Sequence, residues 1–116
     1  MKKVLIVEDD MIIALSTQKM VQKIGHKVIG RVTTGEEAVQ EAVHSKPDVI
    51  LMDIRLAGNI DGIDASSLIL KSVTDTDIIY TTGNTDQSYL ERAGKTGYKA
   101  FLVKPVSMID LKKSFE

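Results

Sequence analysis

The sequence predicts an α/β domain, built as a doubly wound, five-stranded parallel sheet with helices on both faces. Short apolar runs rich in Val and Ile alternate with segments of helical length, which is typical of strands that are buried on both faces. The connections between them are short, so each strand should join its parallel neighbour through a right-handed crossover. The chain has 116 residues, which is enough for one domain, residues 1–116, and too few for two.

Five apolar runs are expected to form the strands, and one of them is weaker than the others. The clear runs are Val4–Val7, Val49–Met52, Ile78–Tyr80 and Ala100–Val103, and the weaker run contains Val28, Ile29 and Val32. The first run follows two lysines, as in a signal peptide. It ends at Glu8, however, which makes it too short for a signal sequence or a membrane span.

Five amphipathic segments are expected to form helices. In the first, Ile13, Met20 and Ile24 share one helical face, and Gly25 is suited to end the helix. The later helices are expected from about Gly35 to His44, from Asp61–Gly62 through Leu68, Ile69 and Val73, from about Asp86, and from Ser107. The order of strand and helix therefore alternates along the whole chain.

Charge and cysteine content exclude several functions. The chain has 15 basic and 16 acidic residues, a net charge of -1 and no run of Lys or Arg, which argues against direct nucleic-acid binding. It has 0 Cys, which excludes disulfides, thiolate metal sites, iron–sulfur clusters and cysteine nucleophiles and is compatible with a reducing cytosol. We therefore expect a cytoplasmic domain with neither nucleic acid nor membrane as a direct partner.

Polar residues gather at the carboxyl ends of the predicted strands. In a doubly wound sheet, ligands bind at this edge, beside the point where the strand order reverses. Each residue alone has an ordinary explanation as a helix cap, a turn or a solvated strand end. We interpret them together as one site, because such explanations would need a coincidence at every strand end. The residues are Glu8, Asp9 and Asp10, then Asp53, then Thr82 and Gly83, then Lys104 and Pro105.

The acidic residues of this edge predict a metal ion. The carboxylates of Asp9, Asp53 and Glu8 would repel one another if they converged, so a cation is expected among them. Oxygen ligands without His or Cys suit Mg²⁺. We assign Asp10 to capping the first helix instead of binding the metal.

The order and spacing of these segments resemble the receiver domain of two-component response regulators, in particular chemotaxis regulators, over nearly the whole chain. The resemblance implies a flavodoxin-like fold and transfer of a phosphoryl group from the phosphohistidine of a sensor histidine kinase to one aspartate, by position Asp53. It implies a regulatory phosphoacceptor and not an enzyme, acting on an output domain or a downstream protein and able to form a homodimer once phosphorylated. The matching segments are Val4–Asp10, Gly35–Ala38, Asp48–Asp53, Asp61–Gly62, Ile78–Gly83 and Lys104–Pro105.

The resemblance also implies how the phosphoryl group would be handled. Mg²⁺ would be held by Glu8, Asp9, Asp53 and the backbone carbonyl of Arg55. Lys104 would pair with the carboxylate of Asp53 before the reaction and with a phosphoryl oxygen after it. The ion and the lysine would together offset the negative charge of the transferring group.

A switch is implied by the same resemblance. The hydroxyl of Thr82 would move toward a phosphoryl oxygen, and Phe101 would turn inward to fill the space that this movement opens. Phe lacks the hydroxyl of the Tyr that many family members carry there. The alternative is that Phe101 is a core residue with one rotamer.

Residues 54–62 depart from the commonest family pattern, because they lack the usual Met-Pro pair and are longer by about one residue. Arg55 lies in this loop. Its side chain either shields the phosphoryl group from water or points to solvent. Arg55 and Asn84 occupy the two positions that control attacking water in the family, and we hypothesise slow self-dephosphorylation.

Two other functions are weighed against this interpretation. Thr81–Thr85 resembles the phosphate loop of a flavin-binding flavodoxin, but that loop belongs after the first strand, where this chain has three acidic residues. A phosphatase of the haloacid dehalogenase type would need a second Asp at position 55, which is Arg.

The final helix, from Ser107, is short for its place, so we expect a receiver cut from a longer chain.

Overall fold

A computed structural model describes residues 1–83 and 87–116 of the chain. It confirms the predicted α/β class, with strands and helices alternating along the chain. The strands are β1 (Lys3–Val7), β2 (Lys27–Val32), β3 (Val49–Asp53), β4 (Asp77–Thr82) and β5 (Ala100–Val103). The helices are α1 (Met11–Ile24), α2 (Gly35–Ser45), α3 (Gly62–Ser72), α4 (Gln87–Gly94) and α5 (Met108–Ser114).

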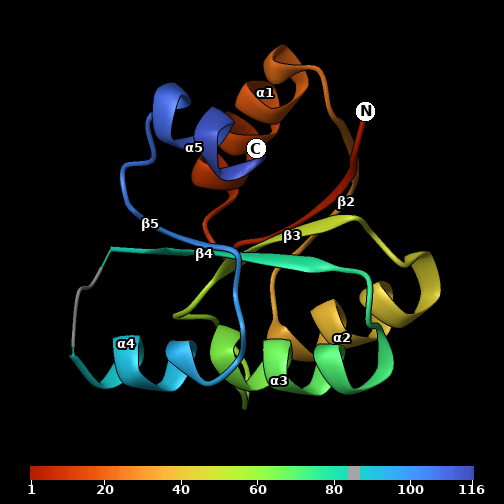
Figure 1. The fold of residues 1–116 in the computed structure, drawn as a ribbon, viewed down its shortest axis with the longest axis vertical. Coiled ribbons are helices and arrows are strands. Elements are labelled where there is room, and N and C mark those ends of the chain that lie inside the picture. The colour runs from red at the N-terminus through yellow and green to blue at the C-terminus, as the bar shows by residue number, and fades with distance from the viewer. Residues whose placement is uncertain (84–86) are drawn as a thin grey trace.

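The five strands form one parallel sheet in the order β2-β1-β3-β4-β5. Helices α1 and α5 cover one face, and α2, α3 and α4 cover the other (Figure 1). The strand order reverses between β1 and β3, so the carboxyl ends of these two strands flank the place where this class of fold binds ligands.

The sheet has a separate apolar core on each face. The core under α2, α3 and α4 includes Leu5, Ile50 and Tyr80, whereas the core under α1 and α5 includes Ile6 and Leu51. Neighbouring strand residues thus point to opposite faces, and both faces are apolar. This explains why the sequence shows continuous apolar runs instead of alternation.

Two strands extend beyond their predicted ends. Strand β4 continues past Tyr80 to Thr82, and β3 includes Asp53 as its last residue. Asp53 pairs with Thr81, and Thr82 pairs with Val103. Hydrophobicity does not reveal these positions, because polar residues take part in the ladder when the neighbouring strand continues alongside them.

Helix α1 has the predicted ends, and its predicted inner face is confirmed at Met20 and Ile24, which pack against the apolar core, but not at Ile13. The Asp10 side chain caps it by accepting hydrogen bonds from the amides of Ile12 and Ile13, and Gly25 ends it with a φ of 105°. The prediction that Ile13 belongs to the inner face is wrong, because its exposed fraction is 36% and Ala14 is buried instead.

The remaining helices begin close to their predicted positions. Thr34 caps α2, Asp61 caps α3 and Ser107 caps α5, each with its side-chain oxygen. Val73 is the residue after α3 and not its last turn, because its backbone is extended. The predicted start of the fourth helix, Asp86, lies outside the described residues, and α4 is described from Gln87. Among the described residues, no helix is long and apolar enough to cross a membrane.

Helix α4 packs on the apolar core through Ala93 and the partly buried Tyr89, and an ion pair joins it to α3. Ala93 is the one residue of α4 that the structure describes as buried. Arg92 Nη1 lies 2.7 Å from Asp61 Oδ2, and its Nη2 lies 3.0 Å from Asp64 Oδ1. Because Asp61 and Asp64 form the first turn of α3, this ion pair joins α4 to the beginning of α3.

The first residue of α3 lies unusually close to the end of β3. The amide of Gly62 donates a hydrogen bond of 2.8 Å to the carbonyl of Ile54. A Cβ atom on Gly62 would lie 2.0 Å from the backbone oxygen of Asp53. Real Cβ atoms do not approach this closely, so only glycine lets α3 begin so near the strand end.

We therefore predict that Gly62→Ala lowers the free energy of unfolding by about 3 kcal/mol, because the collision is with backbone that cannot rotate away. The measurement is urea denaturation followed by circular dichroism. Gly94→Ala is the control, since no atom lies within 4 Å of the added Cβ, and it should leave stability unchanged or raise it by up to about 1 kcal/mol. Equal stability of the two variants would contradict the predicted crowding at Gly62.

Candidate functional site

The register of the sheet brings three predicted acidic residues together. Val7 pairs with Met52, so the residues that follow them, Glu8 and Asp53, lie side by side at the same edge. One carboxylate oxygen each from Glu8, Asp9 and Asp53 lies within 4.8 Å of the other two. Glu8 and Asp53 are buried and Asp9 is exposed, so the cluster opens to solvent on the side of Asp9.

Lys104 lies against this cluster, as the sequence predicts. Its Nζ is 3.1 Å from Asp53 Oδ2 and 2.6 Å from Glu8 Oε1. The amide of Lys104 also donates a 2.7 Å hydrogen bond to the carbonyl of Thr82. The shorter contact, with Glu8, is not foreseen from sequence, because the resemblance assigns Glu8 to the metal alone.

Asp10 stands apart from the cluster. Its carboxylate caps α1, and its amide donates a 3.1 Å hydrogen bond to Glu8 Oε2. This confirms its predicted role as a helix cap. The contact also fixes the Glu8 side chain between the Asp10 amide and Lys104 Nζ.

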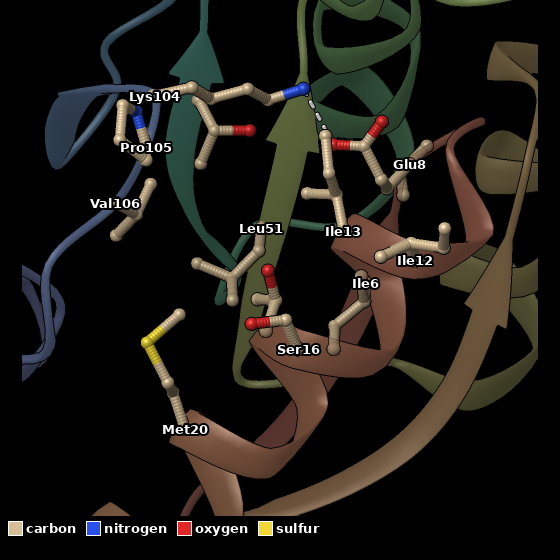
Figure 2. A pocket seen from close by; sticks show the side chains of 13 residues that line it. Ile6, Glu8, Ile12, Ile13, Ser16, Met20, Leu51, Lys104, Pro105 and Val106 are labelled. Carbon is tan, nitrogen blue, oxygen red and sulfur yellow. Dashed lines mark ion pairs between the residues drawn. The ribbon is translucent and has the colours of Figure 1, made fainter.

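An apolar cavity of about 470 Å³ lies beside the ion pair. Figure 2 shows Lys104 extending toward Glu8, with the cavity below them between α1 and the segment after β5. The lining of the cavity includes Ile6, Ile12, Ile13, Met20, Leu51 and Val106. Apolar surroundings of this kind strengthen an ion pair because they reduce screening by water.

The charges of the cluster are not balanced. Three carboxylates face one ammonium group, and the ammonium lies nearest to Glu8. Burial, followed by the neighbouring Glu8 carboxylate, raises the pKa of Asp53 to about 7. Burial and contact with Glu8 likewise raise the pKa of Asp9. These shifts indicate an excess of negative charge that another cation would relieve.

The pKa values of Glu8 and Lys104 shift in the directions that keep both groups charged. Burial alone would raise the pKa of Glu8, but hydrogen bonds from Lys104 and from the Asp10 amide outweigh it and hold that pKa below its usual range. Burial alone would lower the pKa of Lys104, and its contacts with Glu8 and Asp53 raise it instead. Glu8 and Lys104 therefore form a stable charged pair, which leaves Asp53 less well compensated.

The donor set fits Mg²⁺. The cluster offers only carboxylate oxygens, and a hard divalent cation held by a few carboxylates prefers such ligands. The uncompensated negative charge of the cluster would attract such a cation. Glu8, Asp9 and Asp53 are the residues whose side chains could hold it.

Thr82 and Phe101, the predicted switch residues, lie near each other in the sheet. Thr82 is fully buried at the end of β4. Phe101 is partly buried and packs against two tyrosines, with ring centroids 6.2 Å from Tyr80 and 5.9 Å from Tyr98. The two tyrosines also contact each other and complete a three-ring cluster. This cluster is not foreseen from the sequence, because Tyr80 and Tyr98 come from different segments.

The Arg55 side chain is exposed, two residues after Asp53. Asn84, the other position expected to control water, lies outside the described residues.

Two further charged residues near the site are not foreseen from the sequence. Glu36 contacts the loop that follows Asp53, and Arg92 contacts the beginning of the helix after that loop. Charge on an amphipathic helix is common, so nothing in the local pattern distinguishes these two.

Comparison with known proteins decides the family. The family model of the response regulator receiver domain matches residues 4–116. The chain belongs to this family. It is a regulatory domain of phosphorelay signalling in two-component systems, as the resemblance implied, and this membership argues against a flavodoxin or a haloacid dehalogenase-type phosphatase.

Relatives and solved structures agree with this assignment. The chain is 36% identical over 115 residues to the transcriptional regulatory protein PdtaR of Mycobacterium tuberculosis, covering 99% of this chain and 55% of that protein. It is 36% identical over 104 residues to the chemotaxis protein CheY of Thermotoga maritima, covering 90% of this chain and 86% of that protein. The chain thus spans about half of the length of PdtaR.

A solved receiver domain also has the same fold. The signal receiver domain of a modulated diguanylate cyclase from Desulfovibrio desulfuricans G20 superposes with a TM-score of 0.92 at 32% identity. The superposition covers 99% of this chain and 90% of that structure. This agreement supports the flavodoxin-like topology described above.

The raised pKa of Asp53 predicts how stability changes with pH in the metal-free domain. Folded Asp53 keeps a proton up to about pH 7, whereas in the unfolded chain it loses the proton near pH 4. The folded state therefore binds more protons between these values, and stability should fall as pH rises through this range. Asp53→Asn should remove the fall and raise the free energy of unfolding at pH 8 by about 2–4 kcal/mol.

Urea denaturation between pH 4 and 8 with a chelator present measures this effect. Asp75→Asn is the matched control, because Asp75 is exposed in the loop before β4 and outside the cluster. A pH profile of Asp53→Asn that coincides with that of the wild-type domain would show that Asp53 is not the group responsible.

Proposed function

We propose that this receiver domain, residues 1–116, accepts a phosphoryl group on Asp53 from the phosphohistidine of a sensor histidine kinase. The observation that carries the proposal is the position of Asp53. It is a buried carboxylate at the end of a central strand, 3.1 Å from Lys104 and beside two further carboxylates. Phosphoryl transfer depends mainly on positioning and on compensating charge, and these neighbours provide both.

In the proposed reaction, an Asp53 oxygen forms a bond to phosphorus while the phosphorus–nitrogen bond to the donor histidine breaks. The leaving imidazole takes the electron pair of that bond and a proton from solvent, so the donor histidine is released as a neutral side chain. Lys104 starts 3.1 Å from the Asp53 carboxylate and would then pair with a phosphoryl oxygen, while its contact with Glu8 keeps it in place.

Bound Mg²⁺ would compensate the negative charge that accumulates on the transferring group. Glu8, Asp9 and Asp53 would hold it with their side chains, and Arg55 with its backbone carbonyl. Asp9 is the exposed member, so its side of the cluster is where the ion and the donor would enter.

The proposed consequence of phosphorylation is a rearrangement at Thr82 and Phe101. The added group carries about two negative charges, which attract the Thr82 hydroxyl. Phe101 already borders Tyr80 and Tyr98, so its ring could move within an apolar cluster without exposing new polar groups. The rearranged surface would then act on an output domain, a downstream protein or a second copy of the domain.

Incubation with acetyl phosphate and Mg²⁺, followed by mass mapping, tests the acceptor. We expect one added phosphoryl group on the peptide that contains Asp53 and none in Asp53→Asn, because the acidic cluster and Lys104 converge at Asp53. Asp75→Asn serves as the control and should be modified like the wild-type domain. Modification that persists unchanged in Asp53→Asn would disprove the assignment.

We also propose that Arg55 prolongs the phosphorylated state. Its exposed side chain is long and carries only hydrogen-bond donors, so it can pair with a phosphoryl oxygen but cannot activate water.

Arg55→Ala should therefore shorten the phosphorylated lifetime by about threefold to tenfold, corresponding to about one lost charge-assisted hydrogen bond. The measurement is loss of labelled phosphate after removal of the donor. Arg31→Ala, which changes an exposed arginine on β2, is the control and should keep the wild-type lifetime. An unchanged or longer lifetime in Arg55→Ala would mean that this side chain stays in solvent.

A further inference from the structure

The loop between β3 and α3, residues 54–61, rests against the beginning of α2. A single parallel bridge pairs Thr34, the cap of α2, with Ala57 of the loop. Gly35 lies directly under Ile60, since a Cβ atom on Gly35 would be 2.7 Å from Ile60 Cγ1. The loop that lacks the family's usual Pro is thus supported from outside by another helix.

Glu36 makes the polar contact between α2 and this loop. Its Oε2 accepts a 3.0 Å hydrogen bond from the amide of Asn59. Gly58 has a φ of 98°, and a Cβ atom there would lie 2.8 Å from Glu36 Oε1. The loop backbone therefore bends closely around the carboxylate, and Oε1 is buried with no hydrogen-bond partner among the described residues.

The other end of the loop is fixed to the sheet. The amide of Ile54 donates to the carbonyl of Thr81 at 3.1 Å, and the carbonyl of Ile54 accepts from Gly62 at 2.8 Å. Arg55 follows Ile54 directly, so its backbone lies between this fixed point and the part of the loop that Glu36 holds. Movement at Asn59 would therefore be transmitted toward Arg55.

We propose that Glu36 is a positioning residue for the Mg²⁺ site, acting through the Asn59 amide to keep the Arg55 backbone in its place after Asp53. This inference rests on the proposed function, in which the Arg55 carbonyl is a metal ligand. Mg²⁺ demands near-ideal octahedral geometry, so a small displacement of one ligand weakens binding. Residues that orient metal ligands typically contribute tenfold or more to affinity.

Glu37 provides a matched comparison one residue away. It lies in the same first turn of α2 and is also a glutamate. Its Oε1 accepts hydrogen bonds from the hydroxyls of Thr33 at 3.0 Å and Thr34 at 3.1 Å, both in the segment just before α2, and not from the Asn59 amide that Glu36 holds. Removing its carboxylate tests the general effect of changing α2 without removing the bond to Asn59.

The experiment is a Mg²⁺ titration of the ¹⁵N-labelled domain followed by amide chemical shifts. We expect Glu36→Ala to weaken Mg²⁺ affinity about tenfold. Glu36→Gln should bind nearly as well as the wild-type domain, because its amide oxygen can still accept the Asn59 hydrogen bond. Glu37→Ala should also bind nearly normally, and Asp9→Ala, which removes a direct ligand, should bind most weakly.

A second measurement needs no metal. Hydrogen exchange at the Asn59 amide should be faster in Glu36→Ala than in the wild-type domain, and Glu36→Gln should restore slow exchange. If Glu36→Ala does not fold, Glu36→Asp takes its place, since the carboxylate is then one methylene too short and the same losses are expected.

Three results would overturn the inference. They are wild-type Mg²⁺ affinity in Glu36→Ala, an equal loss in Glu37→Ala, and failure of Glu36→Gln to restore affinity. Failure of the metal site in the proposed function gives a different pattern, because the wild-type domain would then bind no Mg²⁺ at all, whereas failure of phosphoryl transfer alone would leave these titrations unchanged. If no Mg²⁺ binds, the role of Glu36 at the metal is disproved too, and Asn59 exchange alone decides whether Glu36 anchors the loop.

Discussion

The register of the parallel sheet is the constraint on which the site depends. Strands β1, β3, β4 and β5 end at nearly the same level, because Val7 pairs with Met52, Asp53 with Thr81, and Thr82 with Val103. Neighbouring strands lie about 4.8 Å apart, so residues that follow these ends must be neighbours too. A slip of one residue in any strand would turn its last side chain to the other face and separate the charges.

The same constraint creates an electrostatic problem that the chain solves only in part. Glu8 and Asp53 are held together in a buried place, where two negative charges repel strongly. Lys104 neutralises much of this repulsion, but it is shared between them and lies closer to Glu8. Of these two buried carboxylates, Asp53 is consequently the one with a raised pKa, which makes it sensitive to an added cation.

The fold and the convergence of the candidate site residues could be predicted from sequence, because the signals for both lie within single segments. Val4–Val7 and Val49–Met52 are continuous apolar runs, and the acidic residues and Lys104 directly follow such runs. Contacts between distant segments could not be predicted in this way. The bond from Asn59 to Glu36 joins residues 23 apart, and nothing near either one signals the other.

The same reasoning accounts for the errors at the edges of elements. Ile13 fits an apolar helical face, yet the small side chain of Ala14 is the one that packs against the sheet. Thr81 and Thr82 are polar, yet they extend β4 because β3 and β5 continue beside them. In each case, the deciding information lies in the neighbouring element and not in the segment itself.

The attachment of α4 determines where the domain can deform. Five residues of α3 are buried, whereas in α4 Ala93 is buried and Tyr89 is partly buried against the core, so the ion pair between Arg92 and the first turn of α3 is a larger part of what holds α4. The Arg92 side chain is 40% exposed, which means that dissolved ions screen the attraction. The position of α4 should thus respond to ionic strength, while the sheet and its apolar cores remain unaffected.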